Sequence, residues 1–473
     1  MAEPLKADLC IIGAGSGGLS VAAGAAQLGR KVVLIERHKM GGDCLNYGCV
    51  PSKSLIAAAS HAHAIRRAGE FGVDAGPPKV DFPRVMKHVQ EVIAAIEPND
   101  SVERFEKLGV KVIKAAAKFV SATEVEAGEQ HIRARHFVVA TGSAPFKPPI
   151  PGLDQTPHFT NETIFDNTVL PEHLIVIGGG PIGLELAQAH RRLGARVTVL
   201  EAKQIMPKDD PEAVAIVRES LERDGVVVRE QASVTAVAKT DGGVAVTIAR
   251  AGHSEAIAGT HILLAVGRVA NVEGLGLEAA GIKYSRRGIE VDASLRTSNS
   301  RVSAIGDVAG GLQFTHVAGY HAGLIIRRVL FKVPAKANTT AIPWATYTDP
   351  ELSHVGLTEA QAKEKGLSVS VARWPLHDND RAQAERETHG LAKIVVSGGR
   401  VVGATIVAPH AGDLIMPWVM AVGQRTKLSA MAGMVAAYPT ISEISKRAAS
   451  SYFTPTLFSA RTRAVVKVLS WFG

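Results

Sequence analysis

The sequence predicts an α/β protein in which two similar nucleotide-binding units are followed by a C-terminal α+β unit. Three observations support this prediction. The same glycine pattern occurs twice, 165 residues apart, and each copy lies between two apolar runs of strand length. From about residue 341 the pattern changes to short apolar runs separated by turn residues. At 473 residues, the chain is long enough for about three domains.

The first glycine pattern spans residues 8–36. Its parts are, in order, a strand over Leu9–Ile12, the glycines Gly13, Gly15 and Gly18, a helix that ends at Leu28, a strand over Val32–Ile35 and the acidic Glu36. The glycines permit a tight turn and bring the backbone close to a pyrophosphate, while the helix N-terminus supplies N–H donors. The acid is placed to accept hydrogen bonds from ribose hydroxyls. This order predicts a Rossmann-like dinucleotide-binding domain.

The second glycine pattern spans residues 174–201 and repeats the first. Its glycines are Gly178, Gly180 and Gly183, and its acid is Glu201. In both copies the acid lies 18 residues after the third glycine. Two equally spaced copies predict two dinucleotide sites. The alternative is a duplicated fold whose second site has decayed, and the intact second set of glycines disfavours it.

Two of the three cysteines, Cys44 and Cys49, lie in the stretch GGDCLNYGCVPSK. On a straight α-helix their Cα atoms would be about 8–9 Å apart, beyond the roughly 7 Å limit for a disulfide. If the two cysteines pair, the chain must bend between them, and Gly48 can adopt the necessary dihedral angles. The alternative is a pair of small buried residues in a loop, which the surrounding sequence disfavours.

A helix is expected over Ser52–Arg67, with Pro51 in its first turn, where a missing N–H costs nothing. Cys49 then lies at a helix N-terminus, which favours its thiolate form. Lys53 follows four residues later on the same helical face and adds a positive charge. Cys10 lies inside the first strand and is expected to be inert core. Two nucleotide sites and one dithiol together predict an electron relay from a nicotinamide through a flavin to a disulfide.

The remaining patterns divide the chain into four segments, namely 1–149 and 269–340 for the first nucleotide domain, 150–268 for the second and 341–473 for the C-terminal domain. A helical stretch is expected over 84–108, a small sheet over 110–135 and a helix after residue 313. An antiparallel sheet is expected over 346–407, with a hairpin turn at residues 397–399. Helices are expected over 411–424, 427–436 and 440–449.

The net charge of +8 is mild for a chain of this length and gives no reason to expect a nucleic-acid partner. Three cysteines exclude a disulfide framework. The sequence shows neither a signal peptide nor a spanning apolar run, so a cytoplasmic location is expected. Near the C-terminus, Arg461, Arg463 and Lys467 alternate with apolar residues. This tail is expected either to touch an anionic membrane surface weakly or to pack on the protein.

Over nearly its full length the chain resembles the class I pyridine nucleotide–disulfide oxidoreductases, and GGDCLNYGCVPSK is most similar to their dihydrolipoamide dehydrogenase and mercuric reductase branches. The resemblance implies FAD at the first glycine pattern and a nicotinamide nucleotide at the second. It implies that Cys49 faces the flavin, that Cys44 attacks the substrate and that Lys53 pairs with Glu185. It also implies a homodimer formed through residues 341–473. Further FAD contacts implied by the resemblance are Gly41, Gly42, Lys53, Ala117, Thr141, Gly142, Asp307, Gln313, Phe314, Thr315 and His316, and further nicotinamide contacts are Val234 and Gly267.

Glu201 indicates which nicotinamide nucleotide is used. A carboxylate at this strand end accepts from the adenosine 2′-hydroxyl and repels a 2′-phosphate, so NADH is expected. Lys203 lies nearby and keeps NADPH as an alternative.

One motif departs from the family pattern. The family's acid–base element is His-Pro-Thr-x-x-Glu, whereas this chain has Tyr438 in place of the histidine and keeps Glu443. A phenol with a pKa near 10 is a poor base at pH 7. His410 is a candidate substitute by sequence alone, and the favoured alternative is that it is a solvated surface histidine. A tyrosine here resembles mercuric reductases, but the sequence has no cysteine after Cys49 to deliver a metal ion.

Three functions are therefore considered. The first is an NADH-dependent reductase of a small disulfide or oxidant, similar to dihydrolipoamide dehydrogenase, with FAD as cofactor and no bound metal. The second is a metal-ion reductase acting at Cys44 and Cys49. The third is a non-enzymatic redox sensor.

Overall fold

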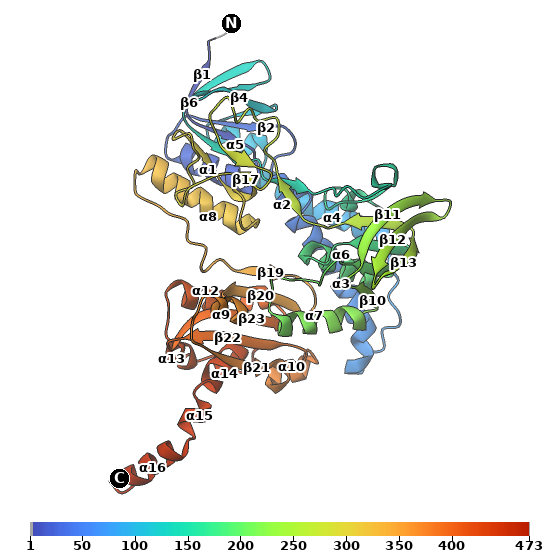
Figure 1. Ribbon diagram of the computed structural model, residues 1–473, viewed down its shortest axis with the longest axis vertical. Coiled ribbons are helices and arrows are strands. Elements are labelled where there is room, and N and C mark those ends of the chain that lie inside the picture. The colour runs from blue at the N-terminus through green and yellow to red at the C-terminus, as the bar shows by residue number, and fades with distance from the viewer. Residues whose placement is uncertain (1–2, 473) are drawn as a thin grey trace. The chain divides into compact units, whose positions relative to one another are not determined.

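The computed structural model describes residues 3–472, which form two compact units (Figure 1). Unit 1 comprises the chain up to Lys203 together with Arg229–Ala337, and unit 2 comprises Gln204–Val228 and the chain from Asn338 onwards. The finer division into the four segments expected from the sequence stays a proposal.

The first sheet of unit 1 has seven strands in the order β3-β2-β1-β6-β5-β4, with β18 also paired to β6. Strands β1, β2, β3, β6 and β18 pair in parallel, while β4 and β5 are antiparallel. The apolar runs of β1 and β2 are buried, as parallel strands covered on both faces require. The strands of this sheet are β1 (Leu5–Ile12), β2 (Val32–Glu36), β3 (Val110–Lys114), β4 (Ala117–Ser121), β5 (Glu124–Ala127), β6 (Gln130–Val139) and β18 (Val302–Ala304). The helices around it are α1 (Ser16–Gln27), α2 (Gly42–Asn46), α3 (Cys49–Arg67), α4 (Phe82–Ile96), α5 (Val102–Lys107) and α8 (Thr315–Ile325).

A second, smaller parallel sheet in unit 1 repeats the strand–helix–strand arrangement. Strand β8 pairs in parallel with β9 and β14, and α6 connects β8 to β9. An antiparallel three-stranded sheet, β11-β12-β13, leads into β14. The elements are β8 (His173–Ile177), α6 (Pro181–Leu193), β9 (Arg196–Leu200), β11 (Ser233–Thr240), β12 (Gly243–Arg250), β13 (His253–Gly259) and β14 (His261–Leu264). Short strands are β7 (Ser143–Pro145) paired with β15 (Arg268–Ala270), and β16 (Tyr284–Ser285) paired with β17 (Gly288–Ile289). In β10 (Val226–Arg229), the residues up to Val228 are assigned to unit 2 and Arg229 to unit 1.

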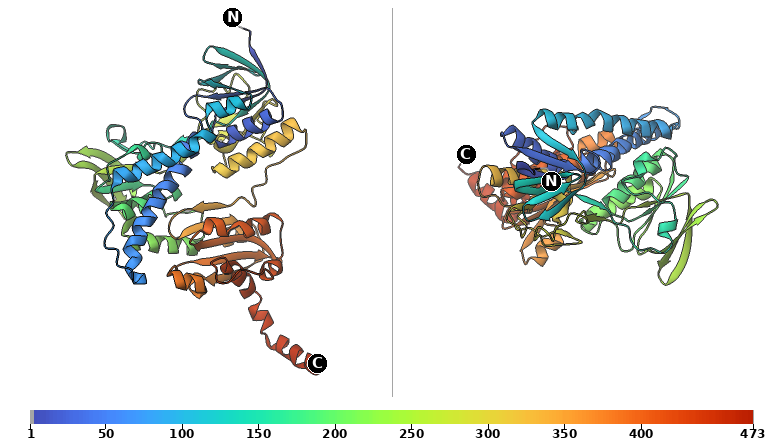
Figure 2. Two further views of the ribbon diagram at one scale, coloured as in Figure 1. Left: turned by 180° about the vertical axis from the view of Figure 1, so that it is seen from behind. Right: turned by 90° about the horizontal axis from the view of Figure 1, so that it is seen from above.

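Helix α3 is central to unit 1 because it packs against both α4 and α6. Seen from behind, the long helices α3 and α4 lie side by side (Figure 2). The helical stretch expected over 84–108 is confirmed, but it consists of two α-helices, because α4 ends at Ile96, where Pro98 has no N–H to donate and its ring clashes with the preceding turn. The small sheet expected over 110–135 is wrong in part, since β3 joins the parallel sheet beside β2.

Unit 2 is built on a five-stranded antiparallel sheet in the order β19-β20-β23-β22-β21. The hairpin expected at residues 397–399 is confirmed between β22 and β23. The expected helix 411–424 is divided in two after Leu414. The strands are β19 (Trp344–Thr346), β20 (Glu351–Gly356), β21 (Val369–Pro375), β22 (Leu391–Ser397) and β23 (Arg400–Ala408). The helices are α7 (Pro211–Arg223), α9 (Glu359–Glu364), α10 (Asp380–Glu385), α11 (Ala411–Leu414), α12 (Met416–Gly423), α13 (Leu428–Ala432), α14 (Glu443–Ser451), α15 (Thr454–Leu457) and α16 (Ala460–Leu469).

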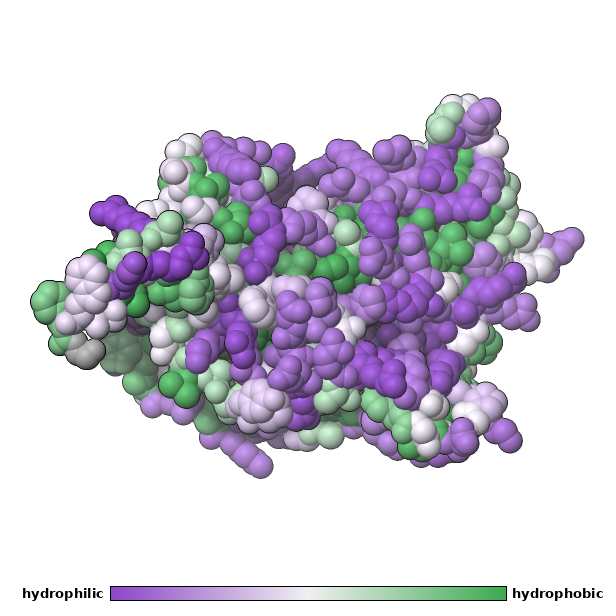
Figure 3. All heavy atoms as spheres, turned by 90° about the horizontal axis from the view of Figure 1, so that it is seen from below, coloured by the Kyte–Doolittle hydropathy of each residue, from purple (hydrophilic) through white to green (hydrophobic). Residues whose placement is uncertain are grey.

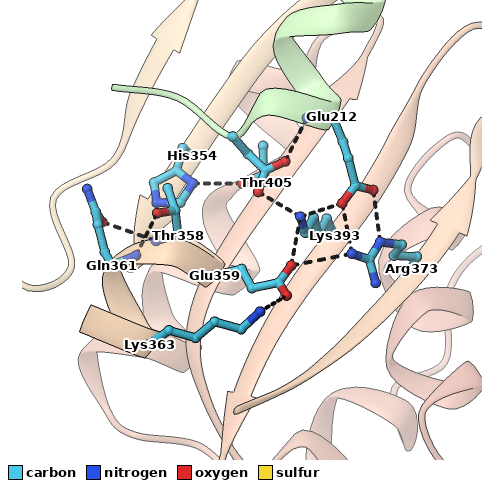
Figure 4. A network of polar contacts seen from close by, with 10 residues as sticks. Glu212, His354, Thr358, Glu359, Gln361, Lys363, Arg373, Lys393 and Thr405 are labelled. Atoms are coloured by element: carbon cyan, nitrogen blue, oxygen red, sulfur yellow. Dashed lines mark hydrogen bonds and ion pairs between the residues drawn. The ribbon is translucent and has the colours of Figure 1, made fainter. Parts of the chain in front are cut away.

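Alternate residues of the unit 2 sheet belong to different environments. One set, including Ile394, Ala404 and Ile406, forms an apolar core with Trp418 of α12 and with residues of α14. The other set is a polar cross-strand row (Figure 4). Its members are paired across neighbouring strands and are Arg373, Lys393, Thr405 and His354.

The polar row explains why α7 belongs to unit 2. The Lys393 side chain is only 4% exposed, and its Nζ lies 2.8 Å from Asp210 Oδ2 and 2.6 Å from Glu212 Oε1. Asp210 also caps the N-terminus of α7 by accepting from the Glu212 N–H. Glu359 and Arg373 complete the network around these groups (Figure 4). A buried ammonium needs such partners, so the lysine and the start of α7 hold each other in place.

Within residues 3–472, no helix has both the length and the apolar character needed to cross a bilayer.

Candidate active site

The cysteine stretch lies directly against the first glycine pattern. Gly41 and Gly42 adopt positive φ angles of 83° and 60°, and the Gly41 N–H donates to the Ala14 carbonyl at 2.9 Å. A Cβ on Gly42 would lie 2.7 Å from the Gly15 Cα, so the two backbones are in contact. The positive φ angles and this close approach together require glycine at position 42. The loop that carries the cysteines is thereby fixed at the expected phosphate site.

The expected bend between the cysteines is confirmed. Helix α2 ends at Asn46, Gly48 has unusual dihedrals (φ −123°, ψ −107°), and α3 begins at Cys49. Cys44 and Cys49 are not joined by a disulfide in this structure, and their side chains are close enough to change each other's pKa. Cys49 also has an exposed Sγ, 3.3 Å from the Thr315 Oγ1 at the first residue of α8. Two helix N-termini therefore meet at the Cys49 sulfur.

The two thiols are polarised in opposite directions. The hydrogen bond from Cys44, the Thr315 hydroxyl and the Lys53 charge together lower the pKa of Cys49 to about 6, although burial and the Asp43 charge act in the opposite direction. The same Cys44–Cys49 hydrogen bond, together with burial, raises the pKa of Cys44. At neutral pH, Cys49 is thus the thiolate and Cys44 holds the proton. Burial also raises the pKa of Cys10, as expected for an inert core thiol.

Lys53 connects the cysteine helix to the second glycine pattern. Its Nζ lies 2.8 Å from the Glu185 Oε2, and the Glu185 side chain is only 6% exposed. Lys53 is four residues after Cys49 on α3, while Glu185 is two residues after Gly183 on α6. The implied Lys53–Glu185 ion pair is therefore present, and it fixes a positive charge between the dithiol and the second dinucleotide loop.

The two glycine patterns have the same local geometry. In the first, a Cβ on Gly13 would lie 2.4 Å from the Ala140 carbonyl oxygen, and one on Gly18 would lie 1.9 Å from the Gly13 carbonyl oxygen. A Cβ on Gly15 would meet nothing closer than 3.9 Å, so its backbone faces open space. The outer glycines make the tight turn, and the middle one leaves room for a pyrophosphate. The second pattern repeats these features at Gly178, Gly183 and the open Gly180.

The acids that end the two patterns also have matching roles. The Glu36 carboxylate accepts from the Ala14 N–H and the His38 N–H, each at 2.7 Å. The Glu201 carboxylate accepts from the Gly179 N–H at 2.8 Å and the Lys203 N–H at 2.9 Å. Each acid therefore closes its own glycine loop and retains acceptor sites for a ribose. The residues present fit two dinucleotides.

The other expected cofactor residues occupy varied positions in unit 1. Asp307 accepts from the Ser143 hydroxyl at 2.5 Å, and burial raises its pKa. Thr141 donates through Oγ1 to the Asn271 carbonyl at 2.8 Å. Gly142 and Gly267 have positive φ angles and open space where a Cβ would be. The rings of Phe314 and His316 stack with their centroids 5.2 Å apart. Of the other positions, Gln313 precedes α8, Ala117 is buried in β4 and Val234 lies in β11. Their contacts to cofactors stay predictions.

The sequence did not predict the cluster of hydrogen bonds around Arg268. Arg268, on β15, donates from Nη2 to the Asp43 Oδ1 at 2.9 Å and from Nε to the Ser143 Oγ at 2.8 Å. Its Nη1 reaches the Asn161 Oδ1 at 3.3 Å. The guanidinium thus ties the cysteine loop, through Asp43, to the hydroxyl that also bonds Asp307. The only local signal was an arginine directly after Gly267 and a charged residue beside Cys44.

Tyr438 and Glu443 belong to unit 2, whereas the cysteines belong to unit 1. The Tyr438 side chain is 68% exposed, and its hydroxyl donates to the Asp380 Oδ2 at 2.9 Å. That hydrogen bond raises the pKa of Tyr438, so the phenol is protonated at neutral pH. Glu443 is the first residue of α14 and faces Arg447 at 3.9 Å. Neither the hydrogen bond to Asp380 nor the position of Glu443 allows Tyr438 to act as a base.

Two dinucleotide loops, together with a polarised dithiol whose helix is ion-paired to the second of them, define a flavin- and nicotinamide-dependent dithiol enzyme. Comparison with known families agrees. The chain belongs to the pyridine nucleotide-disulphide oxidoreductase family, whose sequence pattern matches residues 7–322, and the dimerisation domain of that family matches residues 342–449. The protein is therefore an FAD- and NAD(P)-dependent oxidoreductase, as the sequence predicts, and its dimerisation domain supports a homodimer.

Relatives of two kinds are about equally similar to the chain. It is 34% identical over 454 residues to a mercuric reductase of Streptomyces lividans, covering 94% of this chain and 96% of that protein. It is 35% identical over 460 residues to a dihydrolipoyl dehydrogenase of Geobacillus stearothermophilus, with the same coverage. Among solved structures, the Cu(II) complex of the HOCl-induced flavoprotein disulfide reductase RclA from Escherichia coli has a TM-score of 0.84 at 27% identity, covering 94% of this chain and 99% of that one. LpdA from Mycobacterium tuberculosis has a TM-score of 0.85 at 29% identity, with the same coverage.

Proposed function

We propose that the protein is an NADH-dependent reductase that passes electrons through FAD to the Cys44–Cys49 pair and then to a small disulfide or oxidant. The observation that carries this proposal is the contact between the cysteine loop and the first glycine pattern, where Gly42 lies against Gly15. When bound, FAD supplies two-electron transfer between a nicotinamide and the cysteine pair. Gly13, Gly15, Gly18, Glu36 and Asp307 would hold it, and Gly178, Gly180, Gly183 and Glu201 would hold the nicotinamide nucleotide.

The chain's own residues divide the dithiol chemistry between them. With the pair reduced, Cys44 attacks a substrate disulfide once it has lost its proton, and one substrate thiolate leaves as the mixed disulfide forms. Cys49, already a thiolate, attacks the Cys44 sulfur, releases the second substrate thiolate and restores the Cys44–Cys49 disulfide. The Lys53 ammonium stabilises the Cys49 thiolate between turnovers. Two protons are needed for the two departing thiolates.

The chain has no evident base for the proton-transfer step, because a tyrosine replaces the histidine of the family motif. Tyr438 is hydrogen-bonded to Asp380 and keeps its proton at neutral pH. A dithiol substrate depends on a base that can take and return protons. We therefore favour an acceptor whose reduction does not depend on such a base, over efficient turnover of lipoamide.

The second candidate is reduction of a thiophilic metal ion at Cys44 and Cys49. Tyr438 favours it, because transfer of electrons to a thiolate-bound metal ion needs no histidine base. Mercuric reductases are among the relatives. Within the described residues no group of three His, Cys, Asp or Glu side chains is arranged to hold a metal, so the metal ion would be a substrate bound by the two thiols.

The preference for NADH rests on Glu201, whose carboxylate lies at the strand end where a 2′-phosphate would have to bind. Lys203 follows closely, so NADPH is the alternative substrate to be measured. We also propose a cytoplasmic location, because a dithiol poised for turnover requires a reducing compartment.

A screen of acceptors separates these candidates. Steady-state oxidation of NADH and NADPH would be followed with lipoamide, glutathione disulfide, quinones, Hg²⁺ and Cu²⁺, using wild type and Cys44→Ser. Turnover of a disulfide that Cys44→Ser abolishes supports the first proposal. Metal-dependent turnover lost in the same variant supports the second. Acceptor reduction that persists unchanged without Cys44 would contradict both, because the dithiol would not carry the electrons.

A further inference from the structure

The C-terminal tail, residues 450–473, lies beyond the dimerisation domain, whose family match ends at residue 449. Its described part contains two helices, α15 and α16. From Ile444 onwards the sequence has no acidic residue. The basic residues of the tail itself are Arg461, Arg463 and Lys467. The tail therefore carries an uncompensated positive charge at neutral pH.

Helix α16 forms for a local reason and exposes an apolar stripe. The Ser459 side chain caps its N-terminus by accepting from the Thr462 N–H. None of its described residues is buried. The apolar stripe follows the i, i+3, i+4, i+7 spacing of one helical face. Its members, with their exposed fractions, are Val465 (51%), Val468 (46%), Leu469 (62%) and, just past the helix, Phe472 (83%).

The basic side chains lie mainly on the opposite face of α16. Arg463 and Lys467 are four residues apart and share that face, about half a turn away from Val465 and Leu469, while Arg461 lies in line with the stripe, four residues before Val465. Trp471 is 73% exposed at the end of the tail. In Figure 3 the C-terminal segment is at the left of the view, where green hydrophobic and purple hydrophilic residues adjoin. A tail with an apolar stripe, a basic polar face and a terminal aromatic pair has the arrangement that partitions into the headgroup region of a bilayer.

We propose that residues 450–473 dock the enzyme on an anionic lipid surface, with the apolar stripe in the headgroup–acyl boundary and the basic residues against lipid phosphates. Charge complementarity favours this occupant, since an anionic leaflet attracts juxtamembrane Lys and Arg. A second copy of the tail carries the same positive charge and is repelled. The dimerisation domain brings two tails into one particle, and two weak anchors bind far more tightly than one.

The test uses the full-length, FAD-loaded protein and sedimentation with vesicles. Vesicles of phosphatidylcholine alone are compared with equimolar phosphatidylcholine and phosphatidylglycerol. Wild type should bind the anionic vesicles at least about tenfold more tightly, and raising the salt concentration should weaken the binding. Val465→Asn combined with Leu469→Asn should abolish binding. The matched control is Val466→Asn, an equally exposed valine outside the stripe, which should retain most of it.

The charge contribution is tested separately with Arg463→Gln combined with Lys467→Gln, which should remove the preference for phosphatidylglycerol. Equal sedimentation of wild type and the stripe variant, or none with either kind of vesicle, would overturn the proposal. So would a stripe variant that loses its dimer mass in light scattering, because the tail would then belong to the subunit interface. Flavin absorbance of every variant reports folding independently of vesicle binding and of the acceptor that the enzyme uses.

Discussion

Thr315 provides a direct test of how the thiolate at Cys49 is stabilised. Its Oγ1 lies 3.3 Å from the Cys49 Sγ. A thiolate has no proton to donate, so the threonine hydroxyl must be the donor when Cys49 is ionised. This hydrogen bond favours the charged form of Cys49, and its removal must therefore raise the pKa. Thr315→Val keeps the branched shape of the side chain and removes only the donor.

The size of the effect can be estimated. A hydrogen bond to a charged group contributes about 1.5–3 kcal/mol. Because Cys49 is exposed, solvent replaces part of that contribution, and the lower end applies. One pKa unit corresponds to about 1.36 kcal/mol, so the pKa of Cys49 should rise from about 6 by about one unit. At pH 7 the thiolate fraction would fall from about nine-tenths to about one half.

The assay is the rate of alkylation of the anaerobically reduced protein by iodoacetamide between pH 5 and 8. The thiols other than Cys49 should stay unreactive there, because burial raises the pKa of Cys10 and the hydrogen bond to Cys49 raises that of Cys44. Mass spectrometry identifies the alkylated residue. Thr315→Ser, which keeps the hydroxyl, should leave the midpoint near pH 6. An unchanged midpoint in Thr315→Val, or an equal shift in both variants, would refute the reasoning.

Three further predictions follow from the structure. Tyr438→His should raise lipoamide turnover by tenfold or more if a missing base limits it, and no change in kcat relative to wild type would place the limit elsewhere. Glu201→Ala should lower the ratio of kcat/KM for NADH over NADPH by about tenfold, since it removes the charge that repels a 2′-phosphate; an unchanged ratio would mean that Glu201 does not select the nucleotide. Lys393→Met should lower the free energy of unfolding by about 3–5 kcal/mol in urea denaturation, because Asp210 is left buried without its cation. A loss of less than about 1 kcal/mol in the free energy of unfolding of Lys393→Met would contradict the role given to this network. Hydrogen bonds from Arg373 and Lys393 hold the pKa of Glu212 at about 2. The stabilisation from these bonds is therefore present above the unfolded pKa near 4 and is lost as pH falls toward 2.

The parts of the fold that could be predicted are those whose cause is local. The spacing of the glycines in the first pattern predicts a tight turn, and the flanking apolar runs predict the parallel strands. The bend at Gly48 follows from the geometry of a helix. Of the groups that lower the pKa of Cys49, Cys44 and Lys53 are close in sequence, whereas Thr315 is not. The helical stretch over 84–108 was predicted without its internal break, whose cause, Pro98, is also local.

Helix α7 shows what a local pattern leaves open. Its apolar period indicates that one face is buried, but not which sheet buries it. The partners of its first turn, Lys393 and Arg373, lie more than 160 residues further along the chain. Only the antiparallel pairing of β21 with β22 brings these two side chains together opposite Asp210 and Glu212.

The same limit applies within the active site, where it changes the electrostatic interpretation. In the sequence, Asp43 is a negative charge next to Cys44, and its charge raises the pKa of both cysteines. Taken alone, that residue would argue against a thiolate at Cys49. The fold supplies Arg268, 225 positions away, whose Nη2 lies 2.9 Å from the Asp43 carboxylate. The cation offsets the charge of Asp43 while it anchors the loop to Ser143. The cysteine loop therefore depends on a residue at the end of the second nucleotide-binding segment both for its position and for the charge that its thiols experience.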